Sequence, residues 1–138
     1  MKKFSLQLLV SILTFLLTTV VINAKEKNKD CNYTTNGKTY SGKCSFYSTS
    51  LNGNRTTSGE KYDKDKFTAA HRTLPFGTKV KVTDARTGKS TIVRINDRGP
   101  YVKNRVIDIS NAAAKELGVV SRGVFAGKVE VLEKANQN

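Results

Sequence analysis

The sequence predicts one small, mainly β domain, either a barrel or a sandwich, behind an N-terminal export signal. The chain has 138 residues, which is enough for one domain. Several short segments alternate apolar and polar residues with a period of two, as half-buried strands do. Only one segment has both the composition and the caps of a helix. Several short strands with one helix are typical of small barrels and sandwiches.

The first 24 residues have the pattern of a secretory signal peptide. Lys2 and Lys3 form a basic start, an apolar run extends from Phe4 to Ile22, and Ala24 is the small residue at which a peptidase cuts. A retained membrane anchor is the alternative, because the run is close to the length that crosses a bilayer. No cysteine directly follows the run, so we expect no lipid attachment there. The predicted location is the periplasm or the cell envelope.

The polar residues 25–41 come next and predict a linker or a loosely held extension. The compact domain is expected at residues 42–133, followed by a short tail at 134–138. Its first predicted element is a short aromatic strand at Cys44–Tyr47.

The middle of the domain predicts a β-hairpin. Residues 79–84 and 90–97 both alternate apolar and polar side chains. The segment Asp84–Gly88 between them contains a Thr-Gly turn signal. Two alternating segments joined by a short turn are expected to pair as antiparallel strands.

The C-terminal part predicts two strands and the single helix between them. Residues 105–110 and 128–133 alternate in polarity and are expected to be strands. The helix is expected at 111–117, with Ser110 as its N-cap and Gly118 directly after its end.

The chain is strongly basic, with a net charge of +13 that falls to +11 when Lys2 and Lys3 leave with the signal peptide. Such a charge attracts anionic partners, which include phospholipid headgroups, anionic wall polymers and nucleic acid. Export makes nucleic acid the least expected of the three, and no nucleic-acid-binding motif supports it. Solubility alone is the alternative explanation for much of the charge.

The two cysteines, Cys31 and Cys44, are predicted to form a disulfide in an oxidising compartment. In the chain-entropy model, a loop this short contributes roughly 3 kcal/mol. Two free thiols are the alternative. Two thiols and one histidine make a poor metal site, so no metal or other cofactor is expected.

Four residues are candidates for a functional site, and each has a structural alternative. His71 is the single histidine, and a lone histidine is more often structural than catalytic. Asp97 ends a strand and precedes Arg98, Gly99 and Pro100, where it either forms part of a site at the rim or hydrogen-bonds the turn.

Arg98 lowers the pKa of Asp97 if the two form an ion pair, whereas burial raises it. Glu60 follows a polar loop, where a solvated role is usual, and Asp108 is expected to satisfy main-chain groups or Arg98. Motifs for serine or cysteine nucleophiles, zinc proteases and phosphate-binding loops are missing from the sequence. Chemistry driven by carboxyl groups remains, and outside the cytoplasm it indicates glycosidic bonds.

Five motifs in order give the sequence a family resemblance. They are G-K-C-S-F-Y, G-N-R-T-T-S-G-E, F-T-A-A-H-R-T-L-P-F-G-T, V-R-I-N-D-R-G-P and R-V-I-D-I-S-N-A-A-A-K-E-L-G. Together they resemble the rare lipoprotein A family of bacterial cell-envelope proteins, from about Gly42 to Leu132. The resemblance implies a six-stranded double-psi β-barrel with one or two short helices, related to expansins.

The resemblance also implies an activity, that of an endolytic peptidoglycan lytic transglycosylase. Such an enzyme cuts the MurNAc–GlcNAc β-1,4 bond of peptide-stripped glycan strands and leaves a 1,6-anhydro end. It implies catalytic roles for Asp97, His71 and Glu60, because these positions match the family's motifs. We expect Asp97 to protonate the leaving oxygen first, or to act as acid and then base, with Glu60 and His71 as its supports.

Tyr47 is expected to stack on a sugar ring and Arg98 to orient Asp97. A monomer is expected. A non-catalytic, expansin-like wall-binding module is the alternative function, and a protein that acts on anionic polymers through charge alone is the third.

The sequence departs from the usual family pattern in three ways. It places no lipidated cysteine at the expected point. We expect no C-terminal glycan-binding domain after Asn138, and therefore no recruitment to the division site through such a domain. Cys44 and Phe46 stand where the family more often has Ala and Trp, and this suggests a slightly different sugar-facing surface.

Overall fold

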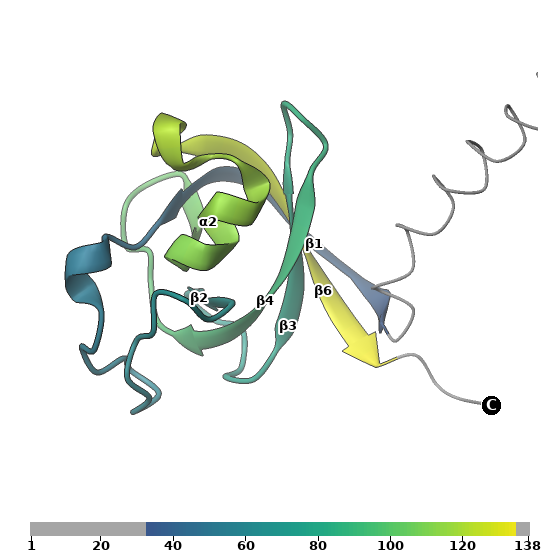
Figure 1. The fold of residues 1–138 in the computed structure, drawn as a ribbon. Helices are drawn as coiled ribbons and strands as arrows, with labels where there is room; N and C mark the ends of the chain where they lie inside the picture. Colours follow the sequence, from purple (N-terminus) through teal and green to yellow (C-terminus); the bar gives the residue numbers. More distant parts are fainter. Residues whose placement is uncertain (1–32, 135–138) are drawn as a thin grey trace, which may run out of the picture. The chain divides into compact units, whose positions relative to one another are not determined.

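The computed structural model describes residues 33–134, so the predicted signal peptide, Cys31 and residues 135–138 lie outside the described residues. The described part forms a closed six-stranded barrel in the order β1-β5-β2-β4-β3-β6 (Figure 1). The strands are β1 (Tyr33–Phe46), β2 (Thr68–Ala70), β3 (Lys79–Asp84), β4 (Ser90–Asp97), β5 (Arg105–Ile109) and β6 (Phe125–Lys134). One α-helix, α2 (Asn111–Leu117), and two 3-10 helices, η1 (Thr49–Leu51) and η2 (Val120–Arg122), complete it.

The predicted hairpin is confirmed. β3 and β4 pair antiparallel, with Val80 opposite Val93, and the Gly88 N–H donates to the Asp84 carbonyl across the turn at 2.9 Å. β6 continues the sheet on the other side of β3, with Val131 opposite Val80. Two parallel pairs, β1 with β5 and β2 with β4, interlock the two halves of the barrel and confirm the double-psi fold.

Two strands differ from the prediction. β2 was missed, because Thr68–Ala70 is too short to display a period and all three of its residues are buried. β1 begins at Tyr33, so the part of the polar extension from residue 33 to residue 41 is strand rather than linker. Its side chains are largely exposed in this part, which explains why they carry no apolar period.

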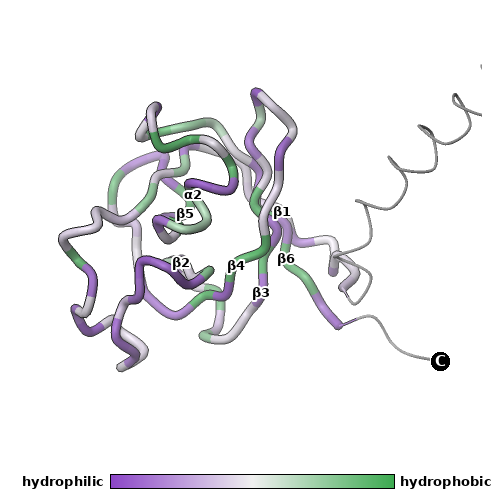
Figure 2. The backbone as a smooth tube through the Cα atoms, viewed as in Figure 1, coloured by the Kyte–Doolittle hydropathy of each residue, from purple (hydrophilic) through white to green (hydrophobic). Residues whose placement is uncertain are grey.

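The core fills the barrel with the inward side chains of the alternating strands. Val80 and Val82 of β3 and Val93 and Ile95 of β4 are fully or almost fully buried, and polar neighbours point outward between them. In Figure 2 the tube changes between hydrophobic and hydrophilic colours along these strands. Each buried aliphatic side chain of this size contributes about 1.5–3 kcal/mol relative to an exposed one.

Helix α2 lies against β4 and has the predicted caps (Figure 1). The Ser110 hydroxyl accepts a hydrogen bond from the Ala113 N–H, and Gly118 has a φ of 69°, in the left-handed region that favours glycine. The apolar face of the helix, which includes Leu117, is buried. Within residues 33–134 no helix is long and apolar enough to cross a membrane.

Cys44 is fully buried and forms no disulfide within residues 33–134, and burial raises the pKa of its thiol to about 12. Its Sγ lies against Gly127, where a Cβ would stand only 2.7 Å from the sulfur. The partner predicted for it, Cys31, lies outside the described residues, so the disulfide stays a prediction.

Candidate active site

Three of the predicted site residues gather where strands end. Asp97 is the last residue of β4, His71 directly follows β2, and Tyr47 directly follows β1. Because β2 and β4 are parallel, their carboxyl ends meet, and the His71 N–H donates to the Asp97 carbonyl at 3.2 Å.

A register shift marks the end of β4. Ala69 lies opposite Ile95, but Ala70 lies opposite Asp97, so β4 contains one extra residue at this point. Bulges of this kind redirect side chains and are common beside active sites. Here the bulge leaves Asn96 almost completely buried while Asp97 is only partly buried.

Three donors hold the Asp97 carboxylate. Oδ2 accepts from the Tyr47 hydroxyl at 2.6 Å, and Oδ1 accepts from the main-chain N–H groups of Thr57 and Arg98 at 2.9 and 2.8 Å. Burial by itself raises the pKa of this carboxyl group, but the hydrogen bonds outweigh it, that of Tyr47 first, and the net pKa is lowered. Asp97 is therefore a fixed, ionised carboxylate at neutral pH.

His71 is buried, and its hydrogen bonds determine its tautomer. Nδ1 accepts from the N–H groups of Thr73 and Leu74, at 3.2 and 3.1 Å, so the proton lies on Nε2. Burial lowers the pKa of His71, and the nearby Arg98 and Arg72 lower it further, which keeps the ring neutral. Nε2 donates to no residue within 33–134, so it can donate to a ligand.

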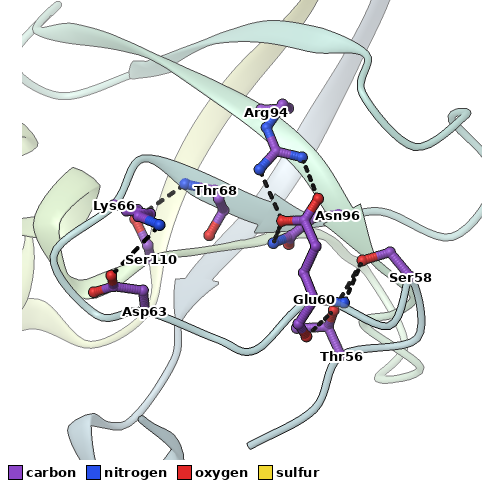
Figure 3. Close-up of polar contacts among 9 residues, drawn as sticks. All are labelled: Thr56, Ser58, Glu60, Asp63, Lys66, Thr68, Arg94, Asn96 and Ser110. Atoms are coloured by element: carbon purple, nitrogen blue, oxygen red, sulfur yellow. Dashed lines mark hydrogen bonds and ion pairs between the residues drawn. The ribbon is translucent and has the colours of Figure 1, made fainter. Parts of the chain in front are cut away.

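Glu60 lies in an ion pair beside β4 (Figure 3). Arg94 donates to both of its carboxylate oxygens at 2.8 Å, and Asn96 donates to Oε2 at 3.2 Å. The hydrogen bonds from Arg94, and then those from Asn96, lower the pKa of Glu60 to about 2. A carboxylate in this state is a poor proton donor, although its side chain is about half exposed.

The loop before β2 connects Glu60 with Asp97. The Thr56 N–H and hydroxyl both donate to the Glu60 carbonyl, at 2.7 and 2.8 Å, and Gly59 turns the chain at a φ of 91°. The next residue after Thr56 is Thr57, whose N–H reaches Asp97. The position of Glu60 is thus coupled to one of the donors on Asp97.

Arg98 contacts Asp97 through its main chain and not through its guanidinium. The Nη1 atom of its side chain donates to the carbonyls of His71 and Leu74 at 3.1 and 2.8 Å, and the guanidinium lies 4.0 Å from the centre of the Phe76 ring. The ion pair between the side chains of Asp97 and Arg98, which the sequence suggested, is not formed. Arg98 therefore holds the loop after β2.

Tyr47 and Asp108 both contact residues that the sequence did not indicate. The Tyr47 hydroxyl holds Asp97, and its ring packs against Tyr62 with the ring centres 4.8 Å apart. Asp108 is structural, as predicted, but its partners are Ser45 at 2.6 Å and Arg105 at 2.7 Å rather than Arg98. Sugar stacking by Tyr47 stays a prediction.

Three residues of the site were missed from the sequence: Thr57, Arg94 and Asn96. Arg94 and Asn96 stand at i and i+2 in the strand that ends in Asp97, and this spacing was a usable signal for a shared face. Thr57 acts through its main chain, which no residue type reveals. Within residues 33–134 no group of three His, Cys, Asp or Glu side chains is placed to hold a metal ion.

Comparisons with known proteins agree with this architecture. A family model described as "Lytic transglycolase" matches residues 32–130. The endolytic peptidoglycan transglycosylase RlpA of Neisseria meningitidis serogroup A is 50% identical over 92 residues, which cover 67% of this chain and 38% of that protein. A probable endolytic peptidoglycan transglycosylase RlpA of Treponema pallidum is 57% identical over 83 residues, which cover 60% of this chain and 26% of that protein. The chain thus spans well under half the length of these relatives.

Solved structures show the same fold. The Streptomyces papain inhibitor matches with a TM-score of 0.55 and 24% identity, covering 70% of this chain and 94% of the inhibitor. A mutant Clavibacter michiganensis expansin in complex with cellohexaose matches with a TM-score of 0.57 and 16% identity, covering 73% of this chain and 54% of the expansin. At these identities the likeness concerns the fold alone.

Proposed function

The chain belongs to the RlpA-like lytic transglycolase family, and from this premise we propose that it is an endolytic peptidoglycan lytic transglycosylase. It cuts the MurNAc–GlcNAc β-1,4 bond, in strands that carry no stem peptides, and leaves 1,6-anhydroMurNAc ends. It works outside the cytoplasm, in the periplasm or cell envelope, where its basic surface also attracts anionic polymers or membrane headgroups.

The observation that carries the proposal is the contrast between the two acidic residues. Asp97 is held by neutral donors and has no cationic partner among residues 33–134, whereas Glu60 forms an ion pair with Arg94. A glycoside hydrolase needs a second working carboxyl group to activate water or to form a covalent adduct. One working carboxylate suits a reaction whose nucleophile is already part of the substrate.

The proton balance of the reaction fits a single carboxylate. The bond from MurNAc C1 to the GlcNAc oxygen breaks, and a bond from C1 to the MurNAc 6-oxygen forms. The proton that leaves the 6-hydroxyl is the proton that the departing oxygen needs. Because the pKa of Asp97 is lowered, we propose that it accepts the proton first and then delivers it, the reverse of the acid-first order expected from the sequence.

The neighbours of Asp97 act on the substrate or on Asp97 itself. The Nε2–H of His71 is a neutral donor for a sugar oxygen beside the reacting bond. Arg94 holds Glu60, and Glu60 fixes the loop that contains Thr57. The Thr57 N–H in turn positions Asp97. The ion pair with Arg94 neutralises the charge of Glu60, so the carboxylates of Glu60 and Asp97 do not repel each other strongly.

The experiment that tests the function is digestion of sacculi from which an amidase has removed the stem peptides. Mass analysis of the released fragments identifies their ends. Anhydro ends are expected. Reducing ends would indicate a hydrolase, and binding without products would indicate the expansin-like wall-binding module; either result would refute the transglycosylase.

Replacement of Tyr47 by Phe is expected to move the acidic limb of the pH profile of kcat/KM to higher pH. The hydrogen bond from the Tyr47 hydroxyl lowers the pKa of Asp97 more than the other hydrogen bonds do, so its loss raises that pKa. Activity that needs the ionised carboxylate is then lost earlier as the pH falls. Assays between about pH 3 and pH 6 cover this range.

The matched control for that change is Tyr62→Phe. The Tyr62 ring packs on Tyr47, but its hydroxyl accepts from the Asn111 N–H at 3.1 Å and does not touch Asp97. The acidic limb is expected to stay in place in this variant. A limb that moves equally in both variants would show that packing, not the hydrogen bond to Asp97, sets it.

Replacement of Glu60 by Gln is expected to lower kcat/KM about tenfold, because the loop that supplies Thr57 loses its anchor on Arg94. Stability is expected to change by less than about 1 kcal/mol, since the pair is largely exposed. Asp65→Asn, in the exposed pair with Lys64, is the control and should change neither quantity. Equal activity of Glu60→Gln and wild type would remove Glu60 from the site.

A further inference from the structure

The Arg98 guanidinium is fixed in place but has no anionic partner within residues 33–134. Its Nη1 atom makes both hydrogen bonds to the carbonyls of the loop after β2, and its face lies on Phe76. The Nε and Nη2 atoms donate to no described residue. These two atoms form the side-on fork with which arginine binds a carboxylate through two parallel hydrogen bonds.

Two other arginines near the site, Arg94 and Arg72, lack this feature. Arg94 has its charge and both terminal nitrogens committed to Glu60. Arg72 uses its own fork on main-chain carbonyls: Nε donates to Pro100 at 2.6 Å, and Nη2 donates to Val102 and Arg105 at 2.9 and 3.0 Å. Unlike Arg94 and Arg72, Arg98 thus keeps its fork open toward every residue in the described part of the chain.

Arg98 also contacts both residues that are proposed to act on the substrate, Asp97 and His71. Its main-chain N–H holds the Asp97 carboxylate, and its side chain holds the carbonyl of His71. The charge lies near enough to His71 to help lower the pKa of that ring. The fork thus belongs to a side chain that is fixed to the main chain of His71 and follows Asp97 directly, the two residues proposed to face the reacting bond.

We propose that the Arg98 fork binds the lactyl carboxylate of a MurNAc residue and thereby selects strands without stem peptides; this inference rests on the proposed function. The lactyl carboxylate is the anionic group of a bare glycan strand. When a stem peptide is attached, the group becomes an amide, which has no charge and only one acceptor oxygen. An amide cannot accept both hydrogen bonds of the fork.

The first test compares two substrates on the wild-type protein. Peptide-free strands are compared with the same strands after carbodiimide coupling of methylamine, which converts each lactyl carboxylate to a methylamide. The wild-type chain is expected to cleave the free carboxylate form with a kcat/KM at least about tenfold higher. This comparison needs no variant, so it holds even if an Arg98 variant fails to fold.

Two variants then assign the selectivity to Arg98. Arg98→Gln is expected to bring the ratio of the two kcat/KM values close to one, and Arg98→Lys, which keeps the charge without the fork, to lower it severalfold. Because the ratio compares two substrates on one protein, a general loss of activity cancels. Arg86→Gln, at the exposed β3–β4 turn, should keep the wild-type ratio.

The outcomes separate the two proposals. If the wild-type chain releases anhydro ends from neither substrate, the proposed function is wrong. If it releases them equally from both, or if Arg98→Gln keeps the full ratio, the function stands and the assignment to Arg98 is wrong.

Discussion

Replacement of Asp97 by Asn is expected to lower the release of 1,6-anhydro ends about a thousandfold, within the range that general acid–base groups contribute. The amide cannot accept the proton of the 6-hydroxyl or deliver it to the leaving oxygen. Its size is nearly that of the carboxylate, and its oxygen can still accept from the N–H groups of Thr57 and Arg98. The loss is therefore expected in kcat, with the site otherwise formed.

The measurement is quantitative mass analysis of fragments released from peptide-free sacculi, with a thermal unfolding curve of each variant. Asp65→Asn makes the same chemical change at an exposed carboxylate and should leave the rate unchanged. Strands should still bind to the Asp97→Asn variant. Wild-type rates from a folded Asp97→Asn variant would show that Asp97 is not the proton carrier.

The fold was predictable where the sequence displays local signals. The β3–β4 hairpin has period-two alternation around a glycine turn, and α2 has a serine and a glycine at its two ends, so both were predicted with nearly correct bounds. β2 gives no such signal, since three small residues that are all buried display no period. Only the closure of the barrel between β4 and β5 makes this segment a strand.

The site was predictable as a set of residues but not as a set of contacts. Family motifs indicated Asp97, His71 and Glu60, yet the partners that set their protonation lie far away in the sequence: Tyr47 is 50 residues from Asp97, and Arg94 is 34 residues from Glu60. For the same reason, charged residues that are adjacent in the sequence did not predict the ion pairs of the site. Arg98 adjoins Asp97 in the chain, but at the sharp turn after β4 its side chain reaches the loop after β2 instead.

Asp84 ends β3 at the turn before β4, whereas the proposed catalytic residue Asp97 ends β4, so a change at Asp84 can be expected to alter stability without altering the proposed activity. Asp84 is fully buried at the β3–β4 turn, where Arg122 donates to both of its oxygens at 3.1 and 2.6 Å and Thr87 donates at 2.7 Å. Asp97 stands at the other end of the strand, roughly 20 Å away for a strand of this length.

Replacement of Asp84 by Ala is expected to lower the free energy of unfolding by about 3 kcal/mol, because it removes a fully buried carboxylate and leaves the partly buried Arg122 cation without its partner. Urea unfolding at neutral pH measures the loss. Asp63→Ala, which breaks the exposed pair with Lys66, is the control, and a loss below about 1 kcal/mol is expected there. The rate of anhydro-end release per folded molecule should remain that of the wild type.

The pH dependence gives this prediction a second, independent test. Hydrogen bonds from Arg122 lower the pKa of Asp84 well below its usual range. A carboxyl group of this kind stabilises the fold at pH values above its unfolded pKa, and the stabilisation disappears as the pH falls through the lower folded-state pKa. The stability difference between wild type and Asp84→Ala should therefore be constant above about pH 5 and shrink in stronger acid. A difference that persists unchanged in acid would mean that the lost packing of the side chain, and not its charge, stabilises the turn.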